Sequence, residues 1–345
     1  MPADADTMCG YKLSDVRKSL REAIDLRNRR AAHRWAAELV ATPGAVGSLW
    51  AAYWLAWASS PSMTAIPILL RQTWIAVSDA AHQLQDWKAF RNAADVRRCV
   101  TEMTTRLLDT PRQTTVVWPT RDIVLHDVGT MRAAPPPAAA DSQVVLETWD
   151  RLEDSLEARI MAGRFLAAIE SGDLRTSLSA VAWTFLPASL QTVPVKYAGR
   201  GPGSLPPKAR ASPLWFWLEV GGRFLKSRQG HRGWPTMHAA VQEAFQQHYK
   251  RWTAAERMRL LLAWILQIRA SLGPQPADVW RADPVTLEEA DLDLPYKEIA
   301  AELANPNTIL MKKKEKEKDK EVSSSEKKME MGDAAIMASL GLTED

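Results

Sequence analysis

The residues of this 345-residue sequence best suited to bind a ligand are cations interleaved with aromatic rings between Leu174 and Gln242. This interval carries nine basic residues and one acidic residue, Glu219. Cations neutralise phosphates and aromatic rings stack on bases, so the combination is typical of nucleic-acid surfaces. If any aromatic group is exposed for binding, we expect it to be Trp215-Phe216-Trp217, which follows the proline-rich loop and lies next to the basic positions. The candidate nucleic-acid-binding residues are Lys196, Arg200, Lys208, Arg210, Trp215, Trp217, Arg223, Lys226, Arg228 and Arg232.

Motifs for catalysis, nucleotide binding and metal binding are missing. The sequence contains no GxxxxGK[ST], GxSxG or HExxH string, and its six histidines form no i,i+4 pair. The nearest glycine string, residues 199–204, has Pro202 where a phosphate-binding loop needs a backbone N–H, so we interpret it as a flexible loop. We therefore predict no catalytic residues, no cofactor and no metal site, and keep an enzyme of unrecognised type as the third hypothesis.

Charge is segregated along the chain although the total is only +3. Residues 12–34 carry eight basic and three acidic side chains, whereas residues 283–302 carry seven acidic side chains and a single lysine, Lys297. Segregation of this kind lets a protein dock on itself or on a complementary partner. Solvated faces and intramolecular pairing are the plainer interpretation of the same pattern.

Hydrophobic periodicity predicts helices nearly everywhere, and hence an all-α fold. Between Glu38 and Arg71 no residue is charged, and Trp50, Trp54 and Trp57 recur at i, i+4 and i+7. Prolines and glycines interrupt this stretch, and its longest apolar piece, residues 49–58, is too short to cross a bilayer. We therefore expect a buried core helix here and no membrane span.

Two segments, residues 20–39 and 166–185, each show a helix, a short break and a second helix with small residues followed by a tryptophan. The breaks contain Asn28 and Gly172-Asp173, which suit a helix cap. Such αα-hairpins resemble the units of tetratricopeptide-like arrays and, more faintly, the helical collar domains of clamp-loader-like ATPases. No 34-residue period continues along the chain, so the resemblance indicates no family.

Composition divides the chain into two predicted helical lobes built from αα-hairpins. The first spans residues 1–130 and includes a small β-hairpin expected near 114–126, formed by residues 114–118 and 122–126. A Pro/Ala-rich linker, 131–141, leads to a second lobe, 142–305, which contains a Pro/Gly-rich loop at 187–213. Residues 306–345 are predicted to be a disordered charged tail with a short terminal helix.

The leading hypothesis from the sequence is a non-catalytic scaffold or adaptor that works in a protein assembly. The tail adds Ile336, Met337 and Leu340 on one side of a short helix, which are candidate partner-binding residues. The alternative is an accessory nucleic-acid-binding protein that uses residues 196–234. Two cysteines 90 positions apart and an acidic N-terminus favour a reducing, intracellular compartment, cytoplasmic or nuclear. No feature sets an oligomeric state.

Overall fold

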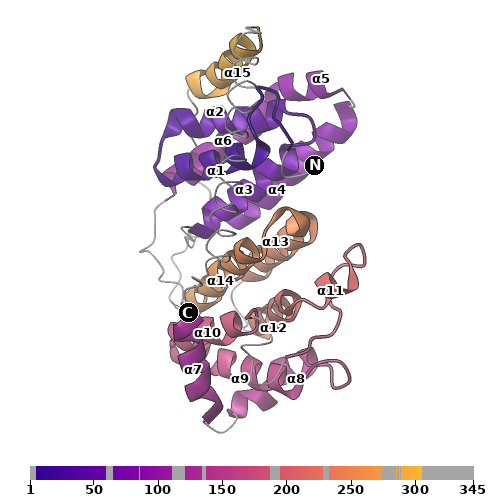
Figure 1. Cartoon of the computed structure of the whole chain (residues 1–345). Coiled ribbons are helices and arrows are strands. Elements are labelled where there is room, and N and C mark those ends of the chain that lie inside the picture. The colour runs from indigo at the N-terminus through magenta and orange to yellow at the C-terminus, as the bar shows by residue number, and fades with distance from the viewer. Residues whose placement is uncertain are drawn as a thin grey trace, which may run out of the picture.

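The computed structural model describes residues 5–59, 65–84, 86–110, 121–133, 137–186, 195–227, 233–273, 285, 287 and 289–304. These residues form helices joined by short connections and contain no β-strand, so the predicted all-α fold is confirmed. The described helices lie in three tiers (Figure 1). No described helix is long and apolar enough to cross a membrane.

The first tier surrounds a helix that is buried on every side. This helix, α3 (Val46–Ser59), contacts α1 (Leu13–Asp25), α2 (Arg29–Ala41), α4 (Ile66–Leu84) and α6 (Ala94–Asp109). Trp50, Trp54 and Trp57 are all buried, and the Trp50 indole N–H donates to the Leu70 carbonyl oxygen at 2.9 Å. The core helix expected between Glu38 and Arg71 is therefore confirmed. The tier is completed by α5 (Trp87–Asn92) and by α15 (Glu289–Ala304), which packs on α2 and α6.

The middle tier is formed by α13 (Gly233–His248) and α14 (Ala254–Ala270), with a short 3-10 turn, η3 (Tyr249–Arg251), between them. Helix α13 packs on α4, and α14 packs on α3 as well as on α10 and α12 of the next tier. The Trp252 indole N–H donates to the Ala51 carbonyl oxygen at 3.1 Å. The two halves of the chain thus share a continuous interior.

The third tier contains α7 (Arg121–Ala133), α9 (Leu156–Ser171), α10 (Leu174–Trp183) and α12 (Pro213–Ser227). The shorter elements η1 (Ala138–Asp141), α8 (Gln143–Thr148) and α11 (Pro207–Arg210) belong to the same half. Helices α9 and α10 pack on each other, Gly172 ends α9 in the left-handed conformation, and Asp173 caps α10. Asn28 likewise caps α2, and Thr253 with Glu256 forms a capping box at α14. These sequence signals therefore marked real helix ends.

The structure corrects three local expectations. Residues 122–126, expected as the second strand of a hairpin, belong to α7, which packs along α10; residues 114–118 lie outside the described part. Residues 138–141 of the expected linker form η1, which packs on α9. The described helices also cross the expected lobe boundaries, because α7 packs with the second half and α15 with the first.

Candidate functional site

The aromatic residues of the basic segment lie in the interior. Trp215 is 5% exposed and Trp217 is 1% exposed, and Phe216 between them is fully buried. The Trp217 indole N–H donates to Thr184 Oγ1 at 2.9 Å, and the ring of Trp215 stacks on that of Tyr249. The expectation that this group is exposed is wrong, because α12 is packed between α8, α13 and α14 and therefore buries three consecutive side chains.

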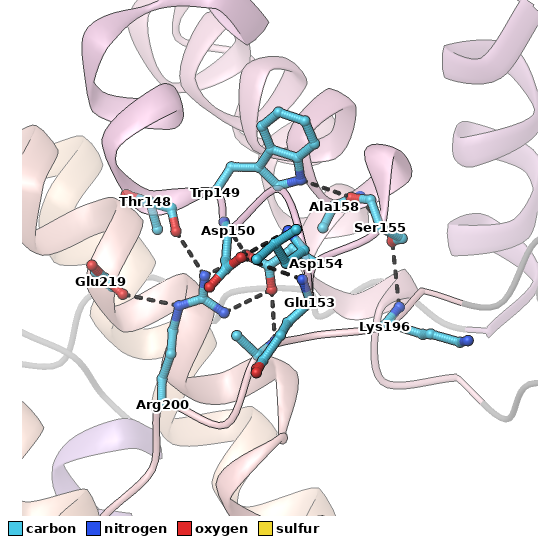
Figure 2. Close-up of polar contacts among 12 residues, drawn as sticks. Thr148, Trp149, Asp150, Glu153, Asp154, Ser155, Ala158, Lys196, Arg200 and Glu219 are labelled. Carbon is cyan, nitrogen blue, oxygen red and sulfur yellow. Dashed lines mark hydrogen bonds and ion pairs between the residues drawn. The ribbon is translucent and has the colours of Figure 1, made fainter.

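Arg200 is the centre of a polar network that holds the segment after residue 195 in place (Figure 2). Its guanidinium group binds both carboxylate oxygens of Asp154, one oxygen of Glu219 and the Thr148 carbonyl oxygen. Asp154 has a fully buried side chain and also accepts hydrogen bonds from the backbone N–H groups of Ala198 and Asp150, both at 2.7 Å. Burial opposes the charge of Arg200, but the hydrogen bonds and charges of Asp154 and Glu219 together outweigh it and raise the arginine pKa.

The glycine string that includes Arg200 is packed against the same half of the molecule. The Gly201 N–H donates to the Arg210 carbonyl oxygen at 3.0 Å, and a Cβ atom at Gly201 would come within 2.6 Å of the Trp215 indole nitrogen. The interpretation of residues 199–204 as a flexible loop is therefore wrong. Glycine is needed at position 201 for a close approach to Trp215, and its N–H is already bonded within the chain.

Next to this network lies a groove of about 770 Å³ between α8, α12 and α13. Its charged rim includes Arg223, which donates to Glu219 on the preceding turn and to Glu147 Oε2 of α8 at 2.8 Å. Arg200 and Arg223 are therefore matched to carboxylates. The lining comprises Ser142, Gln143, Val144, Glu147, Arg200, Trp215, Leu218, Glu219, Gly222, Arg223, Lys226, Ser227, His238, Gln242 and Gln246.

Lys226 is a cation of this groove that no described carboxylate neutralises. Its side chain is exposed at the end of α12 and forms no ion pair with any described residue. Lys196 and Lys208 are also exposed and without an ion pair in the same set, but neither lines the groove. Arg210 is half-buried, with its Nε buried and without a hydrogen bond to any described residue. Arg228 and Arg232 lie outside the described residues, as do Ile336, Met337 and Leu340.

One wall of the groove is a stripe of polar side chains on α13. His238, Gln242 and Gln246 recur every four residues, which places them on one face of the helix. The two glutamines are exposed and make no hydrogen bond with other described side chains. An amide group donates and accepts at once, so this wall can pair with a peptide backbone or with another amide.

His238 forms the inner end of that stripe. Its ring lies 5.3 Å from the Trp264 ring, and it fits over Gly222, where a Cβ atom would overlap it. Burial and, secondarily, the charge of Lys226 lower the pKa of His238 to about 4, so its side chain is neutral at pH 7. No serine, cysteine or carboxylate among the described residues is hydrogen-bonded to it, and no described cluster of His, Cys, Asp or Glu could hold a metal ion.

The sequence pointed to one side of this groove and missed the other. Arg200, Arg223 and Lys226 came from the basic interval, whereas Glu147, His238, Gln242 and Gln246 were not singled out. The spacing of 238, 242 and 246 is visible in the sequence as an i,i+4,i+8 pattern. The sequence does not show that α8 and α12 lie beside α13 and complete a groove with these side chains. Comparisons with protein-family models, with curated proteins and with solved structures found no match to this chain.

Proposed function

We propose that the protein is a non-catalytic helical scaffold or adaptor that holds a segment of a partner protein in the groove between α8, α12 and α13. The observation that carries this proposal is the composition of the groove. Two glutamine amides that bond to no other described side chain lie on one wall, and Lys226, which forms no ion pair with a described residue, lies at the rim. Amides match a polypeptide backbone, and the lysine favours a partner segment with an acidic side chain.

The arrangement of the arginines supports binding of a protein over binding of nucleic acid. Arg200 and Arg223 hold Asp154, Glu219 and Glu147, so they stiffen the groove and leave little net charge for phosphates. The rings that would stack on bases, Trp215 and Trp217, are buried. A rigid, mixed-charge groove with amide donors suits a polar peptide better than a polyanion.

Photo-crosslinking from two neighbouring glutamines tests this proposal. A photoreactive residue at Gln246 lies in the groove, whereas the same residue at Gln247 lies outside its lining on the same helix. In cells that express the full chain, we expect Gln246 to crosslink a discrete partner that Gln247 does not, and Lys226→Glu to reduce that product at least fivefold. Identical products from both positions would contradict the proposal.

Nucleic-acid binding stays the second candidate because Lys196, Lys208 and Lys226 are exposed and unpaired among the described residues. If these lysines bind phosphates, the affinity for oligonucleotides falls steeply with salt, and changing all three to glutamate abolishes binding. Changing Lys18, Lys88 and Lys297 to glutamate is the matched control, because these exposed lysines lie on α1, α5 and α15 and give the same change of net charge. Equal losses in both triple variants would show that only net charge matters.

A further inference from the structure

The two oppositely charged segments of the sequence meet in the structure. The basic interval 12–34 contributes α1 and the first half of α2, and the acidic interval 283–302 contributes most of α15. Helix α15 packs on α2 and α6 in the first tier, beyond α3, whereas the preceding helix, α14, lies in the middle tier (Figure 1).

Ion pairs connect α15 to this surface along its length. Arg29 Nη1 lies 3.0 Å from Asp291 Oδ2, and Arg30 Nη2 lies 2.7 Å from Glu298 Oε1. Two further pairs join Arg34 to Glu302 at 2.6 Å and Arg97 of α6 to Asp293 at 3.7 Å. His33 lies 3.7 Å from Asp291 but is neutral at pH 7, because burial lowers its pKa to about 4.

The contact between α15 and the first tier also has an apolar part. Tyr296 and Ile299 of α15 are buried, and the guanidinium carbon of Arg97 lies 4.1 Å from the centroid of the Tyr296 ring. Asp291, Glu298 and Glu302 recur at spacings of seven and four, so they lie on one face of the helix. The contact therefore combines an acidic stripe with three apolar side chains, the buried Tyr296 and Ile299 and the partly buried Leu303.

The arginines of this surface are also held by their own tier. Arg34 donates to Glu38 Oε2 at 3.0 Å, and Glu38 is fully buried and accepts the Cys9 N–H. Arg97 donates to the Asn92 side chain and the Arg91 carbonyl oxygen. Arg29 also donates to Asp109 of α6 at 3.1 Å. These bonds do not involve α15, so three of the four cations keep their positions whether or not α15 is bound.

We infer that the arginine face formed by Arg29, Arg30, Arg34 and Arg97 is a docking surface for acidic helices, and that α15 is its intramolecular occupant. The partner it fits is an amphipathic helix with the spacing of Asp291, Glu298 and Glu302. A tethered segment has an effective concentration of roughly millimolar, so α15 outcompetes weak ligands and yields to a stronger acidic helix. This inference shares with the proposed function only the premise that the chain binds proteins, and it uses a different surface.

A peptide in trans tests the inference on the full chain. The probe is a labelled peptide of residues 286–304, and the loosened chain carries Asp293→Lys and Glu302→Lys, which repel α15 from Arg97 and Arg34. We expect the loosened chain to bind the peptide at least tenfold more tightly than the unaltered chain. A scrambled peptide of the same composition should not bind, and Lys226→Glu in the groove should leave the affinity unchanged, so this surface and the groove can fail separately.

Exchanging the charges of Glu298 in the probe and Arg30 in the chain tests whether the peptide binds at the arginine face. Arg30 is 80% exposed, so its replacement leaves the interior intact. The probe with Glu298→Lys should bind the loosened chain at least fivefold more weakly than the original probe, and adding Arg30→Glu to the chain should restore the loss. No restoration would mean that the peptide binds elsewhere and would overturn the inference.

Hydrogen exchange keeps the test independent of the variants' folding. Excess unlabelled peptide should speed amide exchange in residues 289–304 of the unaltered chain, because α15 is displaced. If the loosened chain has the circular dichroism of the unaltered chain but binds the probe no more tightly, the inference is wrong. If the loosened chain loses helical content, unchanged exchange in the unaltered chain overturns the inference instead.

Discussion

At the scale of single residues, the ionic groups of this protein differ in how much they stabilise the fold, and burial decides the difference. Arg200 binds Asp154, whose side chain is fully buried, whereas Arg175 binds Asp127 with its own side chain 62% exposed. Breaking a buried pair leaves an uncompensated charge in the interior, while an exposed pair is screened by water. Two arginine–aspartate pairs in the same half of the chain thus offer a matched comparison.

We predict that Arg200→Ala lowers the free energy of unfolding by about 3–5 kcal/mol and that Arg175→Ala, at an exposed guanidinium, lowers it far less. Denaturant titration followed by circular dichroism measures both values. Arg200→Lys should fall between them, because lysine keeps the charge but cannot bind both oxygens of Asp154 and Glu219 together. Similar losses for both alanine variants would contradict the role of Arg200 as the anchor of residues 195–200.

At the scale of elements, close helix packing depends on where glycine stands. In α12, Gly221 faces α14, and a Cβ atom there would overlap the Trp264 ring and come within 2.6 Å of Ile268 Cδ1. In α7, a Cβ atom at Gly129 would meet nothing within 4 Å. We predict that Gly221→Ala destabilises the protein by about 1–3 kcal/mol, whereas Gly129→Ala stabilises it by about 0.5–1 kcal/mol. Thermal unfolding of the two variants gives the signs directly, and a stable Gly221→Ala variant would show that α12 and α14 can move apart.

Elements were predictable where the signal is local. The cap at Asn28, the capping box at Thr253 and the uncharged core helix α3 each follow from a few neighbouring residues, and the structure contains all three. Residues 122–126 alternate like a strand, but no described strand lies beside them, and burial of Val124 and Val128 on α10 stabilises a helix instead. Local alternation cannot reveal which surface a segment will meet.

At the scale of the whole molecule, long-range pairing was the part that the sequence left open. The excess of cations between Leu174 and Gln242 suggested a phosphate-binding surface, yet Asp154 and Glu147, which match Arg200 and Arg223, precede that interval in the chain. In the same way, the acids of α15 match arginines more than 190 positions away in sequence. The net charge of one stretch of sequence therefore overestimates the number of cations that are free to bind a ligand, because packing brings distant carboxylates next to them.

Three buried histidines give the protein a pH dependence. His33 lies on α2 in the first tier, and His238 and His248 lie on α13 in the middle tier. Burial is the main cause that lowers the pKa of His33 and His238 to about 4 and that of His248 to about 3. Nearby positive charges lower these pKa values further: Arg29 acts on His33, Lys226 on His238, and Arg251 and Arg17 on His248. At His33 the carboxylates of Asp291 and Asp109 act in the opposite direction and raise the pKa, but burial outweighs them.

The direction of the pH effect follows from these lowered pKa values. Unfolded histidine binds a proton below about pH 6.5. The folded protein keeps His33 and His238 neutral down to about pH 4 and His248 neutral down to about pH 3. The stability that these neutral histidines contribute is therefore fully present above about pH 6.5 and is lost as the pH falls. Each histidine contributes about 2 kcal/mol of this loss between pH 7 and pH 5. We therefore predict a large drop in Tm over that range. The hydrogen bond from Arg175 lowers the pKa of Asp127. Protonation of Asp127 therefore also reduces stability as the pH falls, but only below about pH 5.

His248→Phe isolates one of the three contributions. The His248 ring lies between Trp74 and Trp252, at 4.9 and 5.8 Å, and its Nδ1 has no hydrogen-bond partner among the described residues, so phenylalanine can fill the site without a proton to bind. Between pH 7 and pH 5, the free energy of unfolding of the variant should fall by about a third less than that of the unaltered protein. His82→Gln, at an exposed position of α4, controls for the loss of a histidine as such. An equal drop in Tm for His248→Phe and the unaltered protein would show that acid acts through other groups, and that the shared interior of the tiers does not hold this histidine neutral.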